Sequence, residues 1–252
     1  MQLYRWLVTL AAHFLLAMLS FASTEHVLTV FSIGDSTMAD KPIDAGNPER
    51  GWCQALKTRV AANVRFENHA VNGRSSRSFR TEGRWQVVLD RLQPGDWVLI
   101  QFGHNDQKVE SPERYSHAYT GYREHLSQYV RETRAKGAFP LLMTPIVRRN
   151  FNESGTLVDT HGAYPLVVRL LALELQVPFV DMQLLTERKL IELGPEQSRH
   201  LHLVYEPGEH PFFPDGKADN THLSPQGAEC YAKLFLDAIR EQNLPLAELF
   251  IP

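Results

Sequence analysis

The sequence is poor in cysteine, lacks a basic stripe and, beyond its N-terminus, has no long apolar run. It has only two cysteines, Cys53 and Cys230, and neither belongs to a CxxC or histidine-rich metal-binding pattern. The 252-residue chain carries a formal net charge of −3, and its sequence pI is near 6.4. The missing basic stripe argues against a nucleic acid partner, and the missing polybasic segment argues against binding to a membrane surface.

The N-terminus differs from the rest of the chain. Arg5 precedes an apolar run over residues 6–21, and Ser20 and Ala22 have the spacing of small residues at a signal-peptidase site. This predicts a signal peptide over residues 1–22, followed by one domain over residues 23–252. The alternative is a retained membrane anchor, although the run is short for a span and no basic flank follows it. We therefore expect export to the periplasm or the medium, with no stable membrane insertion after cleavage.

Strand-like and helix-like segments alternate along the remaining chain. Apolar runs predict strands over residues 27–33, 97–102, 137–146 and 177–182, with a shorter second strand that ends near Gly73. Amphipathic spacing predicts helices over residues 51–62, 83–92, 114–136, 164–176 and 224–242. The last helix has Ser224 as a candidate N-cap and Pro225 at its first position. This alternation predicts an α/β domain in which helices cover both faces of a parallel sheet.

Candidate functional residues follow the first three predicted strands. Ser36 comes directly after Gly34 and Asp35, Gly73 ends the second strand, and Asn105 follows the third. Ligands bind outside the carboxyl ends of the strands in doubly wound sheets, and a strand order of 2-1-3 would put Ser36 between the other two. The backbone N–H groups of Ser36 and Gly73 and the amide of Asn105 are neutral donors that can stabilise an oxyanion.

A serine nucleophile also needs a base, because its hydroxyl is weakly nucleophilic at neutral pH. The candidate is His222, which lies before the last predicted helix in the second of two long polar loops, residues 41–50 and 204–222. Asp219 precedes it by three residues, and we expect a tight turn to bring this carboxylate to Nδ1 of the imidazole. The other ring nitrogen would then face Ser36, as in a Ser-His-Asp triad.

These blocks, in this order, resemble the SGNH (GDSL-type) hydrolase superfamily. The stretches GDSTMAD, AVNGRSSRSF, IQFGHND, TPIVRRNF, HGAYP and DNTHLSPQGA are most similar to the rhamnogalacturonan acetylesterase family. The resemblance implies a flavodoxin-like α/β/α fold with a five-stranded parallel sheet in the order 2-1-3-4-5. It also implies Ser36 as nucleophile, Gly73 and Asn105 in the oxyanion hole, His222 as base and Asp219 as the residue that orients it.

The activity implied is that of a secreted serine esterase, without metal or cofactor, that removes O-acetyl groups from polysaccharide, above all from acetylated rhamnogalacturonan. An acetylxylan esterase and a broad short-chain carboxylesterase remain alternatives with the same chemistry. A third possibility is a non-catalytic carbohydrate-binding protein on the same scaffold, although the intact set of Ser36, Asn105 and His222 argues against it.

Several further residues near the predicted site have two interpretations each. Arg74, like Arg77, Arg148 and Arg149, could hold a uronate carboxylate or form a surface ion pair. His104 could contact substrate or make a structural hydrogen bond. Tyr164 could stack on a sugar ring, as could Trp85, or belong to the core. Asp35 is interpreted as an acceptor that stabilises the turn after the first strand.

Two questions about metal and redox chemistry remain open in the sequence. Residues 200–202, His-Leu-His, with His210 nearby, suggest zinc, but their spacing does not correspond to ligands on a fixed helix. Cys53 stands where the family resemblance leads us to expect glycine. It lies on the first predicted helix and Cys230 on the last, so either a disulfide or two separate thiols are compatible with a wound sheet.

Overall fold

The computed structural model describes residues 26–251, and the predicted signal peptide lies outside them. Its centre is a five-stranded parallel sheet in the order β2-β1-β3-β4-β5, which confirms the predicted order. The strands are β1 (Thr29–Gly34), β2 (Arg65–Asn68), β3 (Trp97–Gln101), β4 (Phe139–Met143) and β5 (Phe179–Val180). β1 lies between β2 and β3, so the residues that follow β1 lie between those that follow its two neighbours.

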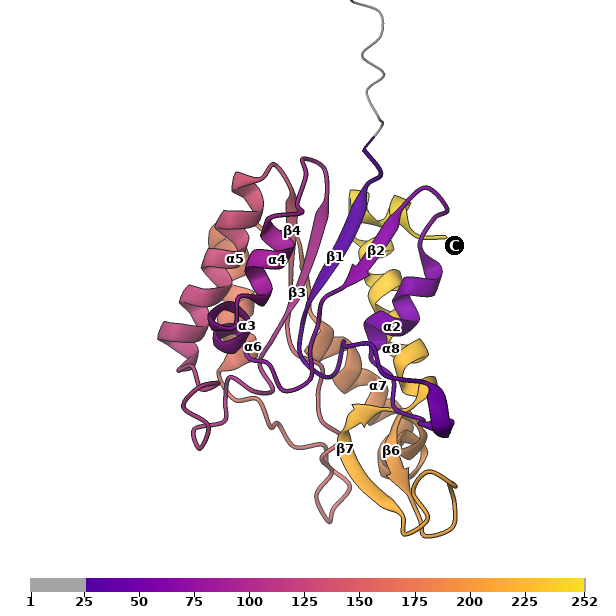
Figure 1. Ribbon diagram of the computed structural model, residues 1–252. Coiled ribbons are helices and arrows are strands. Elements are labelled where there is room, and N and C mark those ends of the chain that lie inside the picture. The colour runs from indigo at the N-terminus through magenta and orange to yellow at the C-terminus, as the bar shows by residue number, and fades with distance from the viewer. Residues whose placement is uncertain (1–25, 252) are drawn as a thin grey trace, which may run out of the picture.

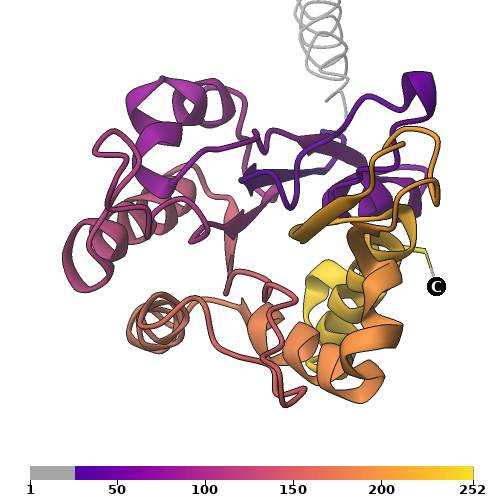
Figure 2. The ribbon, with the colours of Figure 1, turned by 90° about the horizontal axis from the view of Figure 1, so that it is seen from below.

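Helices cover both faces of the sheet (Figures 1 and 2), as the sequence predicts. One face carries α2 (Trp52–Leu56), α7 (Met182–Gln197) and α8 (Pro225–Glu241). The other carries α3 (Ser76–Thr81), α4 (Arg84–Leu89), α5 (Arg123–Ala135) and α6 (Tyr164–Leu175). Among residues 26–251, none of the helices combines the length and apolarity that crossing a bilayer requires.

The strand sequences explain this layering. Side chains alternate along β3, so Trp97 and Leu99 pack in the core under α2 and α8, while Val98 and Ile100 pack in the core under α4 and α5. These four side chains are at most 6% exposed. A strand buried on both faces is predominantly apolar, and β3 is apolar apart from Gln101, which is why this segment is recognisable in the sequence.

Several elements have different boundaries from those predicted. β2 ends at Asn68 rather than near Gly73, because the Asn68 side chain accepts the N–H of Ala70 and turns the chain there. The helix expected from residue 114 begins only at Ala118, with a π-helical turn before α5. The helix expected over residues 51–62 is α-helical only to Leu56.

The structure also contains elements that the sequence did not predict. An antiparallel hairpin of β6 (His202–Tyr205) and β7 (Lys217–Leu223) forms a second small sheet. The expectation of a turn around His222 is therefore wrong, because this residue lies within β7.

The fifth strand is also shorter than predicted, since Asp181 already caps α7 by accepting the N–H of Leu184 at 3.2 Å. At the end of the chain, the Ser224 cap of α8 is confirmed by the N–H of Gly227, which donates to Ser224 Oγ at 3.1 Å.

Candidate active site

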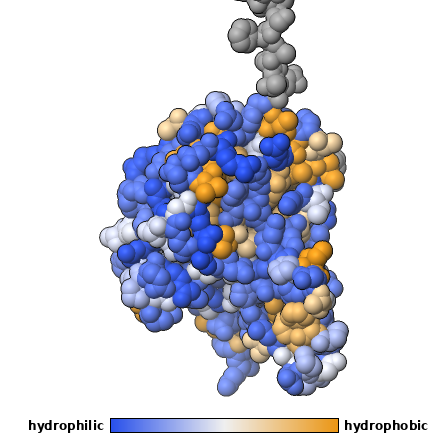
Figure 3. All heavy atoms as spheres, in the orientation of Figure 1, coloured by the Kyte–Doolittle hydropathy of each residue, from blue (hydrophilic) through white to orange (hydrophobic). Residues whose placement is uncertain are grey.

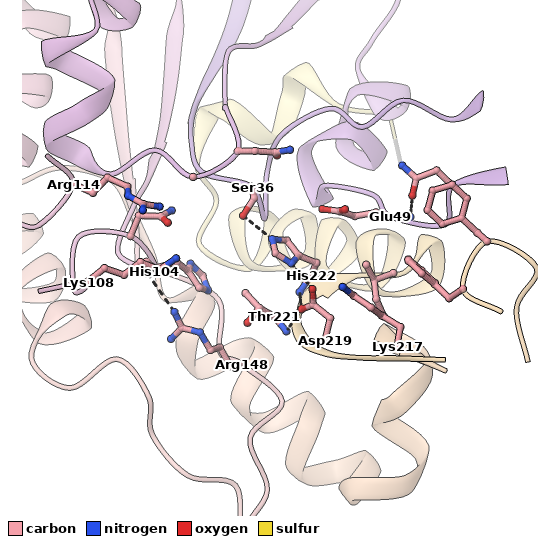
Figure 4. Close-up of a pocket in the computed structure, with 17 residues that line it drawn as sticks. Ser36, Glu49, His104, Lys108, Arg114, Arg148, Lys217, Asp219, Thr221 and His222 are labelled. Atoms are coloured by element: carbon pink, nitrogen blue, oxygen red, sulfur yellow. Dashed lines mark hydrogen bonds and ion pairs between the residues drawn. The ribbon is translucent and has the colours of Figure 1, made fainter. Parts of the chain in front are cut away.

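Ser36, His222 and Asp219 form a continuous hydrogen-bonded chain at the carboxyl end of β1 (Figure 4). Ser36 Oγ lies 2.9 Å from His222 Nε2, and His222 Nδ1 lies 2.8 Å from Asp219 Oδ2. Ser36 and the segment that carries Asp219 and His222 are 183 or more positions apart in the sequence, and the fold brings them together, as predicted. With the Nδ1 proton donated to Asp219, the Nε2 lone pair is free to accept the hydroxyl proton of Ser36.

An irregularity in β7 makes the short Asp219–His222 spacing possible. Asp219 pairs with Leu203 and Leu223 pairs with His202, so three residues of β7 bulge out between two adjacent residues of β6. Within this bulge Asp219 Oδ1 accepts the N–H groups of Thr221 and His222, both at 3.0 Å. The same carboxylate therefore fixes the backbone of the bulge and the ring of His222.

Hydrogen bonds favour the charged form of the Asp219 carboxylate. Burial by itself would raise its pKa, but the hydrogen bonds from the side chain and backbone of His222 and the N–H of Thr221 outweigh this, and they hold the pKa well below its usual range. A fixed negative charge at this point favours the imidazolium that forms when His222 takes a proton.

Three donors surround the space in front of Ser36, and all three residues line one cavity. Within residues 26–251, neither the Ser36 N–H nor the Gly73 N–H has a hydrogen-bond acceptor. One N–H of the Asn105 amide donates to the carbonyl oxygen of Arg74 at 3.1 Å, which orients the side chain and leaves the second amide proton available. Gly73 has a φ of +75°, a conformation that favours glycine.

Gly34 lets the chain turn tightly below Ser36. A Cβ at this position would lie 2.4 Å from Met38 Sδ and 2.6 Å from the Gln101 carbonyl oxygen, so no other residue fits without a shift. The residue between Gly34 and the serine is Asp35, which is completely buried. Its Oδ1 accepts the N–H and the hydroxyl of Thr37, which confirms that it stabilises the turn.

Asp35 also holds His104, the residue beside the candidate oxyanion hole. Asp35 Oδ2 lies 3.1 Å from His104 Nδ1. Although burial opposes it, the interaction with His104 and the hydrogen bonds from Thr37 lower the pKa of Asp35 to about 2. Burial lowers the pKa of His104 despite the raising effect of Asp35, so the pair consists of a carboxylate and a neutral imidazole. His104 lines the cavity while only 3% exposed.

Five residues considered as possible substrate contacts do not line the cavity: Arg74, Arg77, Arg149, Tyr164 and Trp85. The guanidinium of Arg74 points away to Glu82, at 3.0 Å, and to the carbonyl oxygen of Asn72. The hydroxyl of Tyr164 donates to backbone carbonyls of Asp106 and Ser116, and its ring packs on Tyr122 in the core. Trp85 is likewise a core residue.

Other cationic side chains line the cavity in which Arg74 was expected to bind a carboxylate. The cavity has a volume of about 640 Å³, and its lining includes Lys108, Arg114, Arg148 and Lys217. Within the described part of the chain, Lys108, Arg148 and Lys217 have no carboxylate within ion-pair distance, whereas Arg114 pairs with the exposed Glu113. Figure 4 places Lys108, Arg114 and Arg148 on one side of the Ser36–His222 pair and Lys217 on the other. Only Arg148 among them was a candidate in the sequence.

A buried lysine supports the turn that carries Gly73. Lys41 Nζ lies 2.8 Å from Glu49 Oε1 and also donates to Asn72 Oδ1, and its side chain is 2% exposed. Glu49 and Asn72 both line the cavity. The polar loop over residues 41–50 therefore contributes structurally to the site, through a side chain that sequence analysis did not single out.

The two cysteines are free thiols, although α2 and α8 are neighbours as expected. Cys53 is buried in the core shared by these helices, and Cys230 is half-buried. Among residues 26–251, no group of three or more His, Cys, Asp or Glu side chains is arranged to hold a metal ion.

This geometry defines a class of protein: a hydrolase with a doubly wound α/β fold, in which a serine lies beside an imidazole and three neutral hydrogen-bond donors. Comparison with known sequences agrees. Residues 32–230 match the GDSL-like Lipase/Acylhydrolase family, and the chain belongs to that family of ester hydrolases. It is 40% identical over 221 residues to the rhamnogalacturonan acetylesterase RhgT of Bacillus subtilis, a match that covers 88% of this chain and 93% of the relative.

Solved structures share the fold. The crystal structure of YxiM from Bacillus subtilis matches with a TM-score of 0.74 and 25% identity, over 87% of this chain and 58% of YxiM, so this chain spans little more than half of that protein. Axe2, an acetylxylan esterase from Geobacillus stearothermophilus, matches with a TM-score of 0.59 and 23% identity, over 84% of this chain and 94% of Axe2.

Proposed function

We propose that this protein is an exported serine esterase that removes O-acetyl groups from polysaccharide, with acetylated rhamnogalacturonan as its preferred substrate. The observation that carries the proposal is the combination of a Ser36–His222–Asp219 chain with a cavity lined by unpaired cations. A galacturonan backbone bears carboxylates, and guanidinium and ammonium groups are the side chains that recognise them. The extensive similarity to RhgT supports the same substrate.

The proposed reaction proceeds through an acetyl-enzyme. Ser36 Oγ attacks the acetyl carbonyl carbon while His222 Nε2 takes the hydroxyl proton. The N–H groups of Ser36 and Gly73 and the amide of Asn105 stabilise the oxyanion. His222 then returns the proton to the departing sugar oxygen, which leaves as an alcohol. A water molecule, deprotonated by His222, attacks the acetyl carbonyl, and acetate leaves as Ser36 recovers its proton.

The test is the rate of acetate release from acetylated rhamnogalacturonan, acetylated xylan and tributyrin under identical conditions. We expect kcat/KM on rhamnogalacturonan to exceed that on xylan by at least about tenfold, which corresponds to one additional charge-assisted contact of roughly 1.4 kcal/mol. Ser36→Ala, which removes the nucleophile and leaves the fold intact, provides the control for background release.

Each other outcome supports a different function. Equal or faster release from xylan would reject the rhamnogalacturonan preference in favour of an acetylxylan esterase. Fastest hydrolysis of tributyrin would indicate a short-chain carboxylesterase. Binding to polysaccharide without acetate release would indicate a non-catalytic carbohydrate-binding protein.

Export is a separate part of the proposal and rests on the residue pattern of the first 22 positions. Expression of the full chain followed by N-terminal sequencing should give a mature protein that begins at Ser23. Recovery of the full-length chain in the membrane fraction would instead indicate a retained anchor.

A further inference from the structure

The connection between β6 and β7, residues 206–216, places aromatic rings at the edge of the active-site cavity. Phe212 and Phe213 line this cavity together with Ser36 and His222. Phe212 is 40% exposed, so part of its ring is accessible to a ligand in the cavity. In Figure 3 an apolar patch lies over this hairpin within a largely hydrophilic surface.

The rings are held in place by the loop itself. Phe213 stacks on Tyr205 with centroids 5.7 Å apart, and Phe212 meets Phe213 edge to face at 5.0 Å. The backbone is also fixed, since the N–H of Phe213 donates to the His210 carbonyl oxygen and that of Gly216 donates to the Phe213 carbonyl oxygen, both at 2.9 Å. A ligand that covers these rings would therefore bind a surface that is already ordered.

A positive charge lies beside the rings. Lys217 Nζ is 5.7 Å from the centroid of the Phe213 ring, and within residues 26–251 it has no carboxylate partner. Its place at the first residue of β7 puts it two positions before Asp219 in the same strand. Phe212, whose ring meets Phe213 edge to face, and the ammonium group of Lys217, which lies over the Phe213 ring, together suit a sugar ring that has apolar C–H groups on one face and a carboxylate at its rim.

The cavity has room for more than the acetylated sugar alone. Its volume of about 640 Å³ is within the ~300–1,000 Å³ range of sites that enclose ligands larger than one sugar ring. Lys217 and the cations Lys108 and Arg148 lie on opposite sides of the Ser36–His222 pair in Figure 4. A chain of sugars that crosses this pair would therefore meet positive charge on both sides of the reacting ester.

We propose that Phe212, Phe213 and Lys217 form a second sugar subsite, which binds an acidic sugar of the same polymer chain on the Lys217 side of the acetylated one. The acidic sugar stacks on the exposed face of Phe212, and its carboxylate pairs with Lys217. This inference rests on the proposed function, because it requires the substrate to be a polysaccharide.

Phe212→Ala tests the stacking. The measured quantity is kcat/KM on acetylated rhamnogalacturonan oligosaccharides divided by kcat/KM on 4-nitrophenyl acetate, which is too small to reach the subsite. We expect this ratio to fall about tenfold, mainly through KM, as for a buried aromatic contact in a binding site. The matched control is Phe139→Ala at the start of β4, a phenylalanine that is 50% exposed and does not line the cavity. In this control the ratio should not change.

Lys217→Gln tests the charge. We expect kcat/KM to fall on acidic rhamnogalacturonan oligosaccharides and not on neutral acetylated xylo-oligosaccharides, with a weaker salt dependence than in wild type. The control is Lys233→Gln on α8, which removes an exposed lysine outside the cavity.

The outcomes separate this inference from the proposed function. Failure of wild type to release acetate from any oligosaccharide would reject both. Normal deacetylation by wild type, with Phe212→Ala behaving like Phe139→Ala, would reject only the subsite. A loss in Lys217→Gln that is equal on acidic and neutral oligosaccharides would reject the acidic sugar.

Discussion

Asp219 and His222 are three residues apart in one strand, yet their side chains are joined by a hydrogen bond of 2.8 Å. A regular strand would not bring these side chains together, because positions i and i+3 point to opposite faces. The bulge between the Leu203–Asp219 and His202–Leu223 pairs removes this obstacle. The candidate catalytic dyad thus depends on a local break in strand geometry, which Asp219 itself stabilises through two backbone N–H groups.

The first prediction concerns the tautomer that this contact fixes. In Asp219→Asn the amide oxygen can still accept the N–H groups of Thr221 and His222, so the bulge persists. An amide N–H facing Nδ1 favours the tautomer with its proton on Nε2, which leaves Ser36 without a base. We expect kcat to fall about 10³–10⁴-fold with an unchanged melting temperature, measured on 4-nitrophenyl acetate.

The control for this variant is Asp237→Asn, which removes an exposed carboxylate that pairs with Lys233. Activity of Asp219→Asn within a few-fold of this control would contradict the role of the carboxylate in orienting His222.

The second prediction concerns the oxyanion hole. Asn105→Ala removes a donor that acts only when charge develops on the carbonyl oxygen, so the loss should be in kcat rather than KM. We expect a decrease of about 10²–10³-fold. An effect confined to KM would show instead that Asn105 binds the substrate in its ground state.

The sheet could be predicted because its central strands are buried on both faces. The run of residues 97–102, apolar apart from Gln101, predicts a buried strand, and the residues that follow parallel strands lie along one edge of the sheet. This argument located the serine and the oxyanion donors, whereas His222 was identified from its spacing to Asp219 and from the family resemblance.

The second sheet escaped prediction because β7 reads Lys-Ala-Asp-Asn-Thr-His-Leu. Aspartate and asparagine are depleted in strands, and a bulge breaks the alternation by which strands are recognised. α7 was missed although residues 182–193 consist largely of good helix formers behind the Asp181 N-cap, and only its end, where Gly194 has a φ of +68° before Pro195, departs from local propensity. The second sheet is set by tertiary contacts rather than by local propensity.

The lining of the cavity was less predictable than its catalytic residues. Lys108, Arg114 and Lys217 are ordinary surface cations in the sequence, and only the folded chain shows that they converge on Ser36. Arg74 was a candidate because it lies near the predicted end of the second strand. Glu82, at the end of α3, draws its guanidinium away from the cavity.

The third prediction concerns Lys41, which holds Asn72 next to the oxyanion donor Gly73. Lys41→Met keeps most of the buried side-chain volume but leaves Glu49 and Asn72 without their shared donor. We expect about 1–3 kcal/mol lower stability from the unpaired polar groups. We also expect lower kcat on 4-nitrophenyl acetate, because the turn that carries Gly73 is less well fixed.

Lys57→Met is the matched control, since Lys57 is half-exposed and its contact with Asp40 is long, at 3.6 Å. If Lys41→Met and Lys57→Met have the same kcat, Lys41 does not position the turn.

The fourth prediction concerns pH and stability, through His202 in β6. This residue is 1% exposed, and neither ring nitrogen has a hydrogen-bond partner within the described residues. Burial lowers the pKa of His202 from its ordinary value of 6.5 to about 4. Between these values the unfolded chain takes up a proton that the folded chain does not, so stability falls as the pH decreases through this window. This group alone should contribute up to about 3 kcal/mol to the loss.

His202→Phe removes the titrating group and keeps a buried ring. Its free energy of unfolding in urea, compared with wild type at pH 7 and pH 4.5, should shift in favour of the variant by about 2–3 kcal/mol at the lower pH. His200→Gln, which changes an exposed histidine two residues away, should follow wild type at both pH values. If the difference in unfolding free energy between His202→Phe and wild type is the same at pH 7 and pH 4.5, His202 is protonated equally in the folded and unfolded states. Burial of His202 would then not be a source of acid sensitivity.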